Sequence, residues 1–473
     1  MSLNCAEQEL LHRVSQWLDL HEDRMVEGIM RLVKINSVCT PAADPYPYGK
    51  GCAEALEETE RLAAELGFTL TKDEYQYGLI HLPGVSNRSI GLFNHLDVVP
   101  PGDGWLHEPF TPFLHQGHIF GRGASDNKGP SVASLFLLKC LRDLGIALHH
   151  SITLFLGCNE ETGMKDIDFF LARNPAPFFG ISPDATYPVC RGEKGRMLAK
   201  LTASIKDERL ISFEGGVSEG MVPASASMVL AGVPLVALSA ALPEGVEALQ
   251  AGAHVRLQAK GIAAHAGTPE GSRNAIGILA EAAAALDCLA PETRNILRFI
   301  AHMLADYYGE GPGIAFEDFS GKLTHVGGIL RLSAGQLTLS LNIRCPVTAD
   351  FAQIQSQLEA TCAPSGLRVT HIDASPGYCL DADDPIVQAL NDSCNCVWEV
   401  NRQPLVLGGG TYARKLPRAL AFGCSLPGIP RPAPEGHGYG HQPDECVSVE
   451  AMRKSIQIYA LSLVRLDQLL NAH

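Results

Sequence analysis

The sequence has little charge, and that charge is not concentrated in any segment. Charged residues make up 19% of the 473 residues, with 37 Lys and Arg against 52 Asp and Glu. A nucleic-acid partner requires a basic stripe, and a long disordered tail requires a block of like charge. Because neither is present, we expect no nucleic-acid partner and no long tail. The net charge of −15 and the 46% hydrophobic content are typical of a soluble protein of two or three domains.

The 14 cysteines lack the spacing of a zinc-binding or disulfide framework. Cys394 and Cys396 are the only close pair, and no second pair completes a zinc-ribbon motif. We therefore expect reduced thiols in a cytoplasmic protein. The first 25 residues contain several acids and no apolar core, which predicts an amphipathic helix in place of a signal peptide.

A convincing membrane span is also missing. Residues 222–243 carry no charge and are just long enough to cross a bilayer. Internal prolines and many small residues interrupt this run, and no basic residues flank it. The pattern therefore predicts a buried strand followed by a short helix, and we expect no membrane partner.

The order of hydrophobic patterns predicts an α/β fold with an inserted domain. Near-continuous apolar runs that end at His95 and Gly157 alternate with helical patterns, which is typical of a mainly parallel sheet with helices on both faces. From about residue 195 the strand patterns alternate between apolar and polar residues, which indicates an antiparallel sheet. We expect a catalytic domain formed by residues 1–194 and 379–473 and an inserted α+β lid domain formed by residues 195–378.

Polar side chains follow the predicted strands of the first domain, where each strand ends. They are His95 and Asp97 in HLDVVPPGDGW, Asp126 in GRGASDNKG, Glu160 and Glu161 in NEETG, and Asp184 in SPDATYP. Ligands of open parallel sheets bind at the carboxyl ends of the strands, so these groups are expected to converge. A glycine-rich loop, GHGYGHQPDE, adds His437 and His441 as late candidates.

Each of these residues has an ordinary structural explanation when taken alone. A histidine after a strand is commonly structural, acids at a helix start interact with its dipole, and SDNKG is a turn with a helix cap. Taken together, one or two histidines with three or four carboxylates form a ligand set for two metal ions. Such ligands suit zinc, and manganese or cobalt are possible substitutes. A two-metal site needs a bridging carboxylate and an acid left free as the general base.

The ordered set of motifs resembles the di-zinc metallopeptidase family of aminoacylases, desuccinylases and glutamate carboxypeptidases. With GGGTYAR and GHQPDE added, it is most similar to the bacterial dipeptidase V branch, over nearly the whole chain. The resemblance implies that His95 and Asp184 hold one zinc ion, that Glu161 and His441 hold the other, and that Asp126 bridges them. It also implies that Glu160 is the general base, that Asp97 orients His95, and that the peptide bond after Asp126 is cis.

The resemblance also assigns residues that would bind the substrate. His265 in AAHAGTPEGSRNA would stabilise the oxyanion, and Arg344 in NIRCP would bind the free carboxylate of the substrate. Gly409, Gly410 and Thr411 would contact that carboxylate through backbone and hydroxyl groups. One motif departs from the family, because GMVPA places Gly220 where an asparagine is usual. This departure puts oxyanion binding or substrate choice in question and leaves the metal site unaffected.

We therefore expect a monomeric zinc-dependent dipeptidase that hydrolyses small unblocked dipeptides with a free carboxylate. An N-acyl-amino-acid deacylase or desuccinylase of the same family is the alternative, distinguished by the pocket for the amine side of the substrate. A non-catalytic binding protein on the same fold is a further alternative, which the complete set of ligands and base disfavours. Nucleotide binding is also disfavoured, because GGGTYAR lacks the lysine and spacing of a phosphate loop and no GxGxxG follows the first strand.

Overall fold

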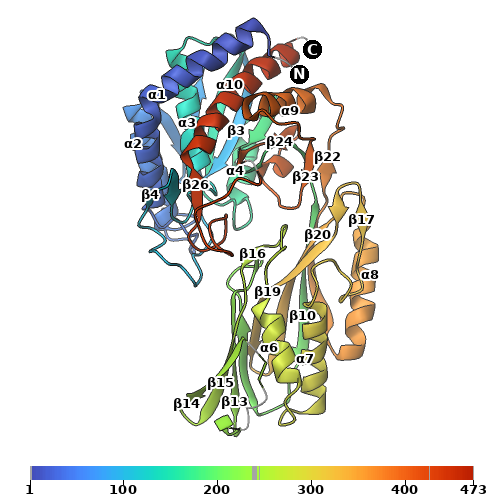
Figure 1. Ribbon diagram of the computed structural model, residues 1–473. Helices are drawn as coiled ribbons and strands as arrows, with labels where there is room; N and C mark the ends of the chain where they lie inside the picture. The colour runs from blue at the N-terminus through green and yellow to red at the C-terminus, as the bar shows by residue number, and fades with distance from the viewer. Residues whose placement is uncertain (1–2, 237–241, 244, 426, 472–473) are drawn as a thin grey trace. The chain divides into compact units, whose positions relative to one another are not determined.

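The computed structural model describes residues 3–236, 242–243, 245–425 and 427–471, and the chain divides into two compact units (Figure 1). The first unit comprises residues 1–192 and 379–473, and the inserted unit comprises residues 193–378. The sequence placed these limits at 194/195 and 378/379. The function of the inserted unit as a lid stays a prediction.

The first unit is built on a nine-stranded sheet of order β1-β2-β6-β3-β7-β24-β9-β22, with β23 paired to β9. Its central strands β6, β3, β7 and β24 are parallel, whereas β1, β2 and β9 pair antiparallel at the edges. The sheet is thus parallel at its centre and antiparallel toward its edges. The strand bounds are β1 Leu70–Asp73, β2 Tyr77–Leu82, β3 Ser86–His95, β6 His150–Gly157, β7 Phe179–Ser182, β9 Cys190–Glu193, β22 Tyr378–Cys379, β23 Leu405–Leu407 and β24 Ala419–Ala421.

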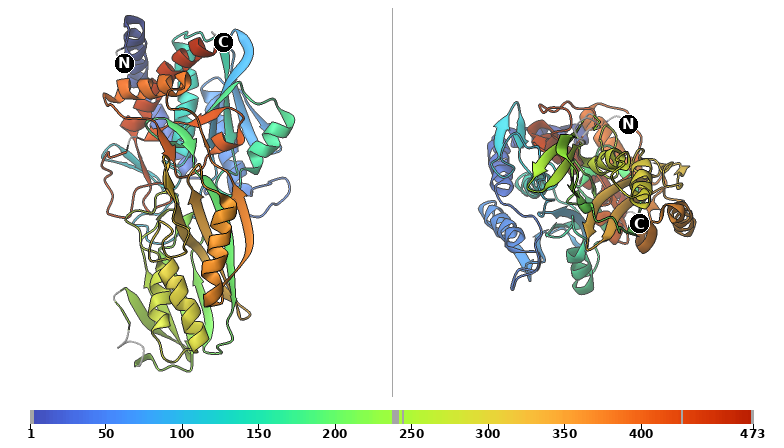
Figure 2. Two further views of the ribbon diagram at one scale, coloured as in Figure 1. Left: turned by 90° about the vertical axis from the view of Figure 1, so that its right-hand side faces the viewer. Right: turned by 90° about the horizontal axis from the view of Figure 1, so that it is seen from below.

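Helices cover both faces of this sheet, as the sequence predicted. One face packs Ile90, Leu92, Leu154 and similar residues into a single core with α1, α2, α3, α9 and α10. The other face carries an aromatic cluster that α4 and the short 3-10 helix η2 close. Figures 1 and 2 show α1 and α10, from opposite ends of the chain, side by side. The bounds are α1 Cys5–Val33, α2 Lys50–Glu65, α3 Lys128–Asp143, α4 Lys165–Arg173, α9 Pro385–Trp398, η2 Tyr412–Lys415 and α10 Val449–Asn471.

Two small sheets in the first unit support loops that carry predicted site residues. The three-stranded sheet β4-β5-β26 brings the segment before Asp126 beside the segment after His441. Residues 118–120 form the central strand of this small sheet. The bounds are β4 Phe113–His115, β5 His118–Phe120, β26 Cys446–Ser448, β8 Ala185–Thr186 and β25 Cys424–Ser425.

The inserted unit is an antiparallel sheet of order β14-β15-β13-β11-β19-β20-β10-β21 with α6, α7 and α8 on one face (Figures 1 and 2). The predicted alternation is clear in β10, where Met197, Ala199 and Leu201 face the helices. The main bounds are β10 Gly195–Ser204, β11 Leu210–Gly215, β13 Ser225–Ala231, β14 Val246–Ala251, β15 His254–Lys260, α6 Ala275–Ala284, α7 Pro291–Met303, β19 Thr324–Ser333, β20 Gln336–Cys345, α8 Phe351–Cys362 and β21 Arg368–Ser375. The shorter elements are β12 Met221–Val222, β16 Ala264–His265, β17 Glu317–Asp318, β18 Gly321–Lys322 and the 3-10 helix η1 Ala363–Ser365.

The uncharged run at 222–243 contributes β13 to this sheet. The short helix predicted after this strand falls largely on residues outside the described part of the chain. Within the described ranges, no helix is long and apolar enough to cross a membrane.

Candidate active site

His95 lies at the carboxyl end of β3, fully buried. Its Nδ1 atom lies 2.9 Å from the backbone oxygen of Asp97 and 3.4 Å from the carboxylate of Asp97. A hydrogen bond from Nδ1–H to these oxygens leaves Nε2 with a lone pair that points away from the strand. His95 therefore presents one nitrogen to the residues that surround the strand end.

Asp126 lies between two imidazoles. Its Oδ1 atom is 3.1 Å from Nε2 of His95, and its Oδ2 atom is 3.2 Å from Nε2 of His441. The peptide bond between Asp126 and Asn127 is cis, which confirms the expectation from the sequence. One carboxylate that faces two histidines through different oxygens is the arrangement expected of a bridging ligand.

The remaining predicted ligands lie on either side of this central carboxylate. Asp184 Oδ2 is 3.6 Å from Nε2 of His95, and Glu161 Oε1 is 3.2 Å from Nε2 of His441. In each of two sets of three residues, one potential ligand atom per residue lies within 4.8 Å of the other two. One set is His95, Glu160 and Asp184, and the other is His95, Asp126 and Glu161. The structure therefore brings all five predicted metal ligands and Glu160 together.

Asp97 connects the strand end to the loop that carries the two glutamates. Its carboxylate accepts hydrogen bonds from the backbone N–H groups of Glu160 at 3.0 Å and Glu161 at 3.1 Å. The Cys39 thiol lies 3.5 Å from the same carboxylate. Asp97 is fully buried, so it fixes the loop and the His95 ring at once.

The cluster contains more negative than positive charge. Five carboxyl groups surround two imidazoles, and among the described residues no Lys or Arg side chain pairs with any of the five. Burial by itself lowers the pKa of His95, but the carboxylates, led by Asp184, raise it well above its ordinary value. His441 behaves in the same way, with Glu161 as the main carboxylate. Burial, followed by the charge of Asp184, raises the pKa of Glu160 well above its usual range.

This donor set fits divalent metal ions. It offers imidazole nitrogens and carboxylate oxygens without thiolates, which suits zinc, manganese or cobalt. One carboxylate oxygen of Glu160, Oε1, is buried and has no hydrogen-bond partner among the described residues. A buried acceptor of this kind is costly unless a further group, such as a water molecule held beside a metal, satisfies it.

Comparison with known proteins agrees with this geometry. The sequence profile of peptidase family M20/M25/M40 matches residues 91–465, which is most of the chain. The chain belongs to peptidase family M20/M25/M40. It is 29% identical over 463 residues to "Putative dipeptidase YtjP" of Bacillus subtilis, covering 94% of this chain and 97% of the relative. It is also 29% identical over 471 residues to the "Beta-Ala-Xaa dipeptidase" of Lactobacillus delbrueckii subsp. lactis, with the same coverage.

Solved structures agree on the fold. Human carnosine dipeptidase 1 aligns with a TM-score of 0.58 and 17% identity, covering 97% of this chain and all of that one. The di-peptidase Dug1p of Saccharomyces cerevisiae aligns with a TM-score of 0.59 and 12% identity, covering 97% and 98%. The predicted α/β fold with an inserted α+β domain is therefore confirmed as the fold of this M20 peptidase.

Four residues predicted to bind the substrate lie on β20 or directly after β23. Gly409, Gly410 and Thr411 follow β23, and Thr411 caps η2 by accepting a hydrogen bond from the N–H of Ala413. Arg344 lies on β20 of the inserted unit, opposite Thr324 and Arg196 in the sheet. The contact of these four residues with a substrate stays a prediction.

The two remaining candidate histidines have different surroundings. His265 lies on β16 of the inserted unit, where it pairs with Met221 and its Nδ1 atom accepts a hydrogen bond from the N–H of Gly267. Its part in catalysis stays a prediction. His437, the first histidine of the glycine-rich loop, does not join the cluster, because its Nδ1 atom lies 2.6 Å from the carboxylate of Asp444.

Several residues that hold the predicted ligands in place gave no signal in the sequence. Glu445 accepts hydrogen bonds from the N–H groups of Ser125 and Asp126 and from the guanidinium group of Arg122, with which it forms a fully buried ion pair. Asn127 donates a hydrogen bond to Asp184 at 2.9 Å. Glu445 and Arg122 both lie inside motifs quoted above, but the two residues are more than 300 positions apart in the sequence, so no local pattern indicates their contact.

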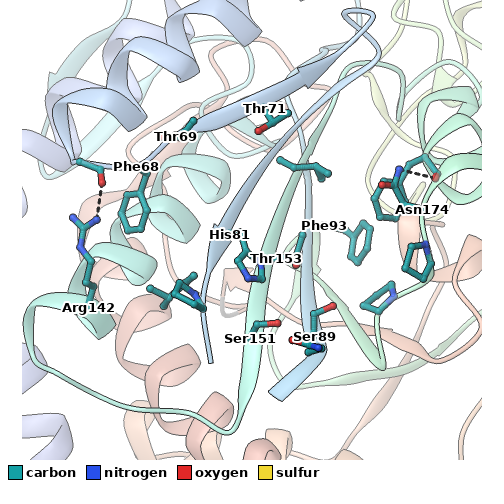
Figure 3. A pocket seen from close by; sticks show the side chains of 18 residues that line it. Phe68, Thr69, Thr71, His81, Ser89, Phe93, Arg142, Ser151, Thr153 and Asn174 are labelled. Atoms are coloured by element: carbon teal, nitrogen blue, oxygen red, sulfur yellow. Dashed lines mark hydrogen bonds between the residues drawn. The ribbon is translucent and has the colours of Figure 1, made fainter. Parts of the chain in front are cut away.

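The first unit has a large groove that does not contain the cluster. Figure 3 shows the residues of a groove across β1, β2, β6 and β3, among them Thr71, His81, Ser89, Ser151 and Thr153. The volume of this groove is about 670 Å³. Ser89 and Ser151 lie near the starts of β3 and β6, whereas His95 ends β3 and Glu161 follows the end of β6. No predicted site residue lines this groove, so its size does not identify it as the active site.

Proposed function

We propose that this M20 peptidase is a di-zinc dipeptidase that hydrolyses small unblocked dipeptides with a free carboxylate. The observation that carries the proposal is Asp126, whose two oxygens face one imidazole each, with an acid beside each imidazole. His95 and Asp184 would hold one ion, and Glu161 and His441 the other. The names of the two bacterial relatives support dipeptides as the substrate class.

The residues of this chain divide the work of hydrolysis. Two divalent cations held by His95, Asp184, Asp126, Glu161 and His441 would polarise the amide carbonyl and lower the pKa of the attacking water. Glu160, through its unpartnered Oε1 atom, accepts the proton of that water and passes it to the leaving amine. Asp97 keeps Glu160 and Glu161 in place through their N–H groups and fixes the tautomer of His95.

The inserted unit would complete the site. His265 would stabilise the oxyanion, and Arg344 would bind the free carboxylate in a bidentate manner, together with Gly409, Gly410 and Thr411. A carboxylate requirement explains why short substrates are favoured, since the charged end must lie at a fixed distance from the scissile bond. The protein would act as a cytoplasmic monomer.

The test is release of free amino acid from unblocked dipeptides, including a β-alanyl dipeptide, beside the matching N-acetyl and N-succinyl amino acids. Each reaction is run with zinc, manganese and cobalt separately, after removal of metal with a chelator. We expect cleavage of unblocked dipeptides only. Cleavage of acylated amino acids only would assign the protein to the deacylase alternative, and inactivity on both sets would favour the binding-protein alternative.

Substitution of the base separates catalysis from metal binding. Glu160→Gln should lower kcat by about 10²- to 10⁴-fold, the usual contribution of a general base, while the bound metal measured by mass spectrometry stays unchanged. Glu54→Gln, a matched change at a half-exposed position on α2, should leave kcat unchanged. Full activity of the Glu160→Gln enzyme would show that the assigned base is wrong.

A further inference from the structure

Asp166 is a fully buried carboxylate that the ligand set does not use. It lies in the first turn of α4, directly after the loop that carries Glu160 and Glu161. Its Oδ2 atom accepts hydrogen bonds from the N–H groups of Cys158 at 2.7 Å and Asn159 at 2.8 Å. Asp166 therefore holds the start of the loop that carries both glutamates, which we call the ligand loop, residues 158–161.

The same oxygen of Asp166 accepts a third hydrogen bond from a distant part of the chain. The hydroxyl group of Tyr412 donates to Oδ2 at 2.5 Å across 246 residues of sequence. Burial, followed by the neighbouring carboxylates, raises the pKa of Tyr412 well above its ordinary value, so the proton stays on the phenol. Burial, followed by the charge of Asp97, raises the pKa of Asp166 to about 6, so the acceptor is ionised at neutral pH. Hydrogen bonds from a neutral donor to an ionised acceptor are among the strong ones.

Tyr412 is enclosed on all sides, so its hydroxyl group has a fixed position. Its ring packs edge-on against Phe155 at 5.4 Å and against His95 at 6.4 Å between centroids. Gly157 leaves the necessary space, because a Cβ atom there would lie 2.0 Å from the Tyr412 hydroxyl oxygen and 2.4 Å from Asp166 Oδ2. The contact between Asp166 and Tyr412 is thus built into the end of β6.

Tyr412 immediately follows Gly409, Gly410 and Thr411, which we call the glycine turn. A second pair spans the same two elements at the surface, where Lys415 Nζ lies 2.9 Å from the carboxylate of Asp168. The ligand loop has another anchor, since Asp97 accepts hydrogen bonds from Glu160 and Glu161. Loss of the Tyr412 hydroxyl is therefore expected to disturb the glycine turn more than the ligand loop.

We propose that Asp166 and Tyr412 are positioning residues that form a buried clamp between the ligand loop and the glycine turn, and that the clamp sets the affinity for the free carboxylate of the substrate. The inference rests on the proposed function, because it takes the glycine turn as the carboxylate-binding segment. Neither residue contacts the reacting atoms. The clamp fixes the distance between the metal ligands and the carboxylate site, and this distance selects substrates by length.

The clamp is tested with Tyr412→Phe, which removes the donor and keeps the ring. We expect KM for an unblocked dipeptide to rise about tenfold, the effect of one hydrogen bond to a charged group, with kcat changed less than about threefold and metal content unchanged. The inhibition constant of the product amino acid should rise by the same factor. Lys415→Ala, which removes the surface pair across the same elements, should change KM less than about twofold.

A second measurement separates failure of the clamp from failure of the proposed function. Hydrogen exchange followed by mass spectrometry needs no activity, and Tyr412→Phe should increase exchange in peptides that cover residues 405–416, whereas Lys415→Ala should not. If the unsubstituted protein cleaves no dipeptide, the proposed function is wrong and exchange alone decides the clamp. Unchanged exchange, or a KM no higher than that of Lys415→Ala, would overturn the proposal. If Tyr412→Phe does not fold, Asp166→Asn keeps a carbonyl acceptor for Tyr412 and should give the same exchange change in weaker form.

Discussion

The ion pair between Arg122 and Glu445 predicts a large loss of stability when Glu445 is changed to glutamine. Both side chains are 1% exposed, and Arg122 Nη1 lies 2.6 Å from Glu445 Oε2. The other carboxylate oxygen, Oε1, accepts hydrogen bonds from Ser125 N–H at 2.8 Å and Asp126 N–H at 3.0 Å. Glutamine keeps one acceptor for these N–H groups, but its amide would point hydrogen atoms at the guanidinium group.

The expected cost follows from the charge that is left without a partner. Removal of one member of a buried ion pair costs about 3 to 5 kcal/mol, because the other charge stays in a medium of low dielectric. We expect Glu445→Gln to lower the free energy of unfolding by about 3 kcal/mol, since Arg122 also contacts the Pro101 carbonyl and the Trp105 ring. Metal affinity should fall about tenfold, because a neutral amide oxygen holds the Asp126 N–H group less firmly than the carboxylate does.

The assay is urea-induced unfolding followed by tryptophan fluorescence. All three tryptophans, Trp17, Trp105 and Trp398, lie in the first unit, so the signal reports on the unit that contains the ion pair. The matched control is Glu435→Gln, an exposed position in the same loop, which should stay within about 0.5 kcal/mol of the unsubstituted protein. A loss below about 1 kcal/mol for Glu445→Gln, together with unchanged metal affinity, would refute the reasoning.

Three further predictions follow from single observations. The surrounding carboxylates raise the pKa values of His95 and His441, so protons compete with metal for these side chains. Metal affinity should therefore fall as the pH is lowered through neutrality, and calorimetry in two buffers should show proton release on binding. A metal affinity that does not change with pH would contradict the ligand assignment. Gly157→Ala should lower the free energy of unfolding by about 1 to 3 kcal/mol in a urea titration, since the added methyl would overlap the Tyr412 hydroxyl. Gly220→Asn enters nearly open space, so it should leave the Tm unchanged while raising kcat for dipeptides; a lower kcat would show that the glycine is needed for substrate entry.

The fold was predictable where hydrophobic pattern decides it. The apolar runs that became β3 and β6 are flanked on both faces by helices, and the alternating strands of the inserted unit have one buried face, as in β10. The antiparallel pairing of β2 with β6 was not predicted, because a strand buried on both faces gives no sign of its direction. Residues 118–120 have a strand pattern too short to show that they pair with β26.

The candidate site was predictable for residues that end strands and fall within a recognisable order of motifs. It was not predictable for residues whose function depends on a distant partner. Glu445 meets Asp126 across 319 residues, and Tyr412 meets Asp166 across 246. A glutamate in a loop or a tyrosine after a glycine turn has many ordinary explanations, and only the folded chain selects one of them.

Asp97 shows why an acid stands two residues after the histidine that ends β3. Strand β3 pairs in parallel with β6, so the segment after His95 lies beside the segment after Gly157. A carboxylate two residues beyond the strand end therefore reaches the N–H groups of Glu160 and Glu161 while its own backbone oxygen meets the His95 ring. A shorter spacing would turn the acid to the other side of the strand, and a longer one would carry it past the neighbouring loop. The spacing thus couples His95, a proposed metal ligand, to Glu160, the proposed general base, through one buried carboxylate.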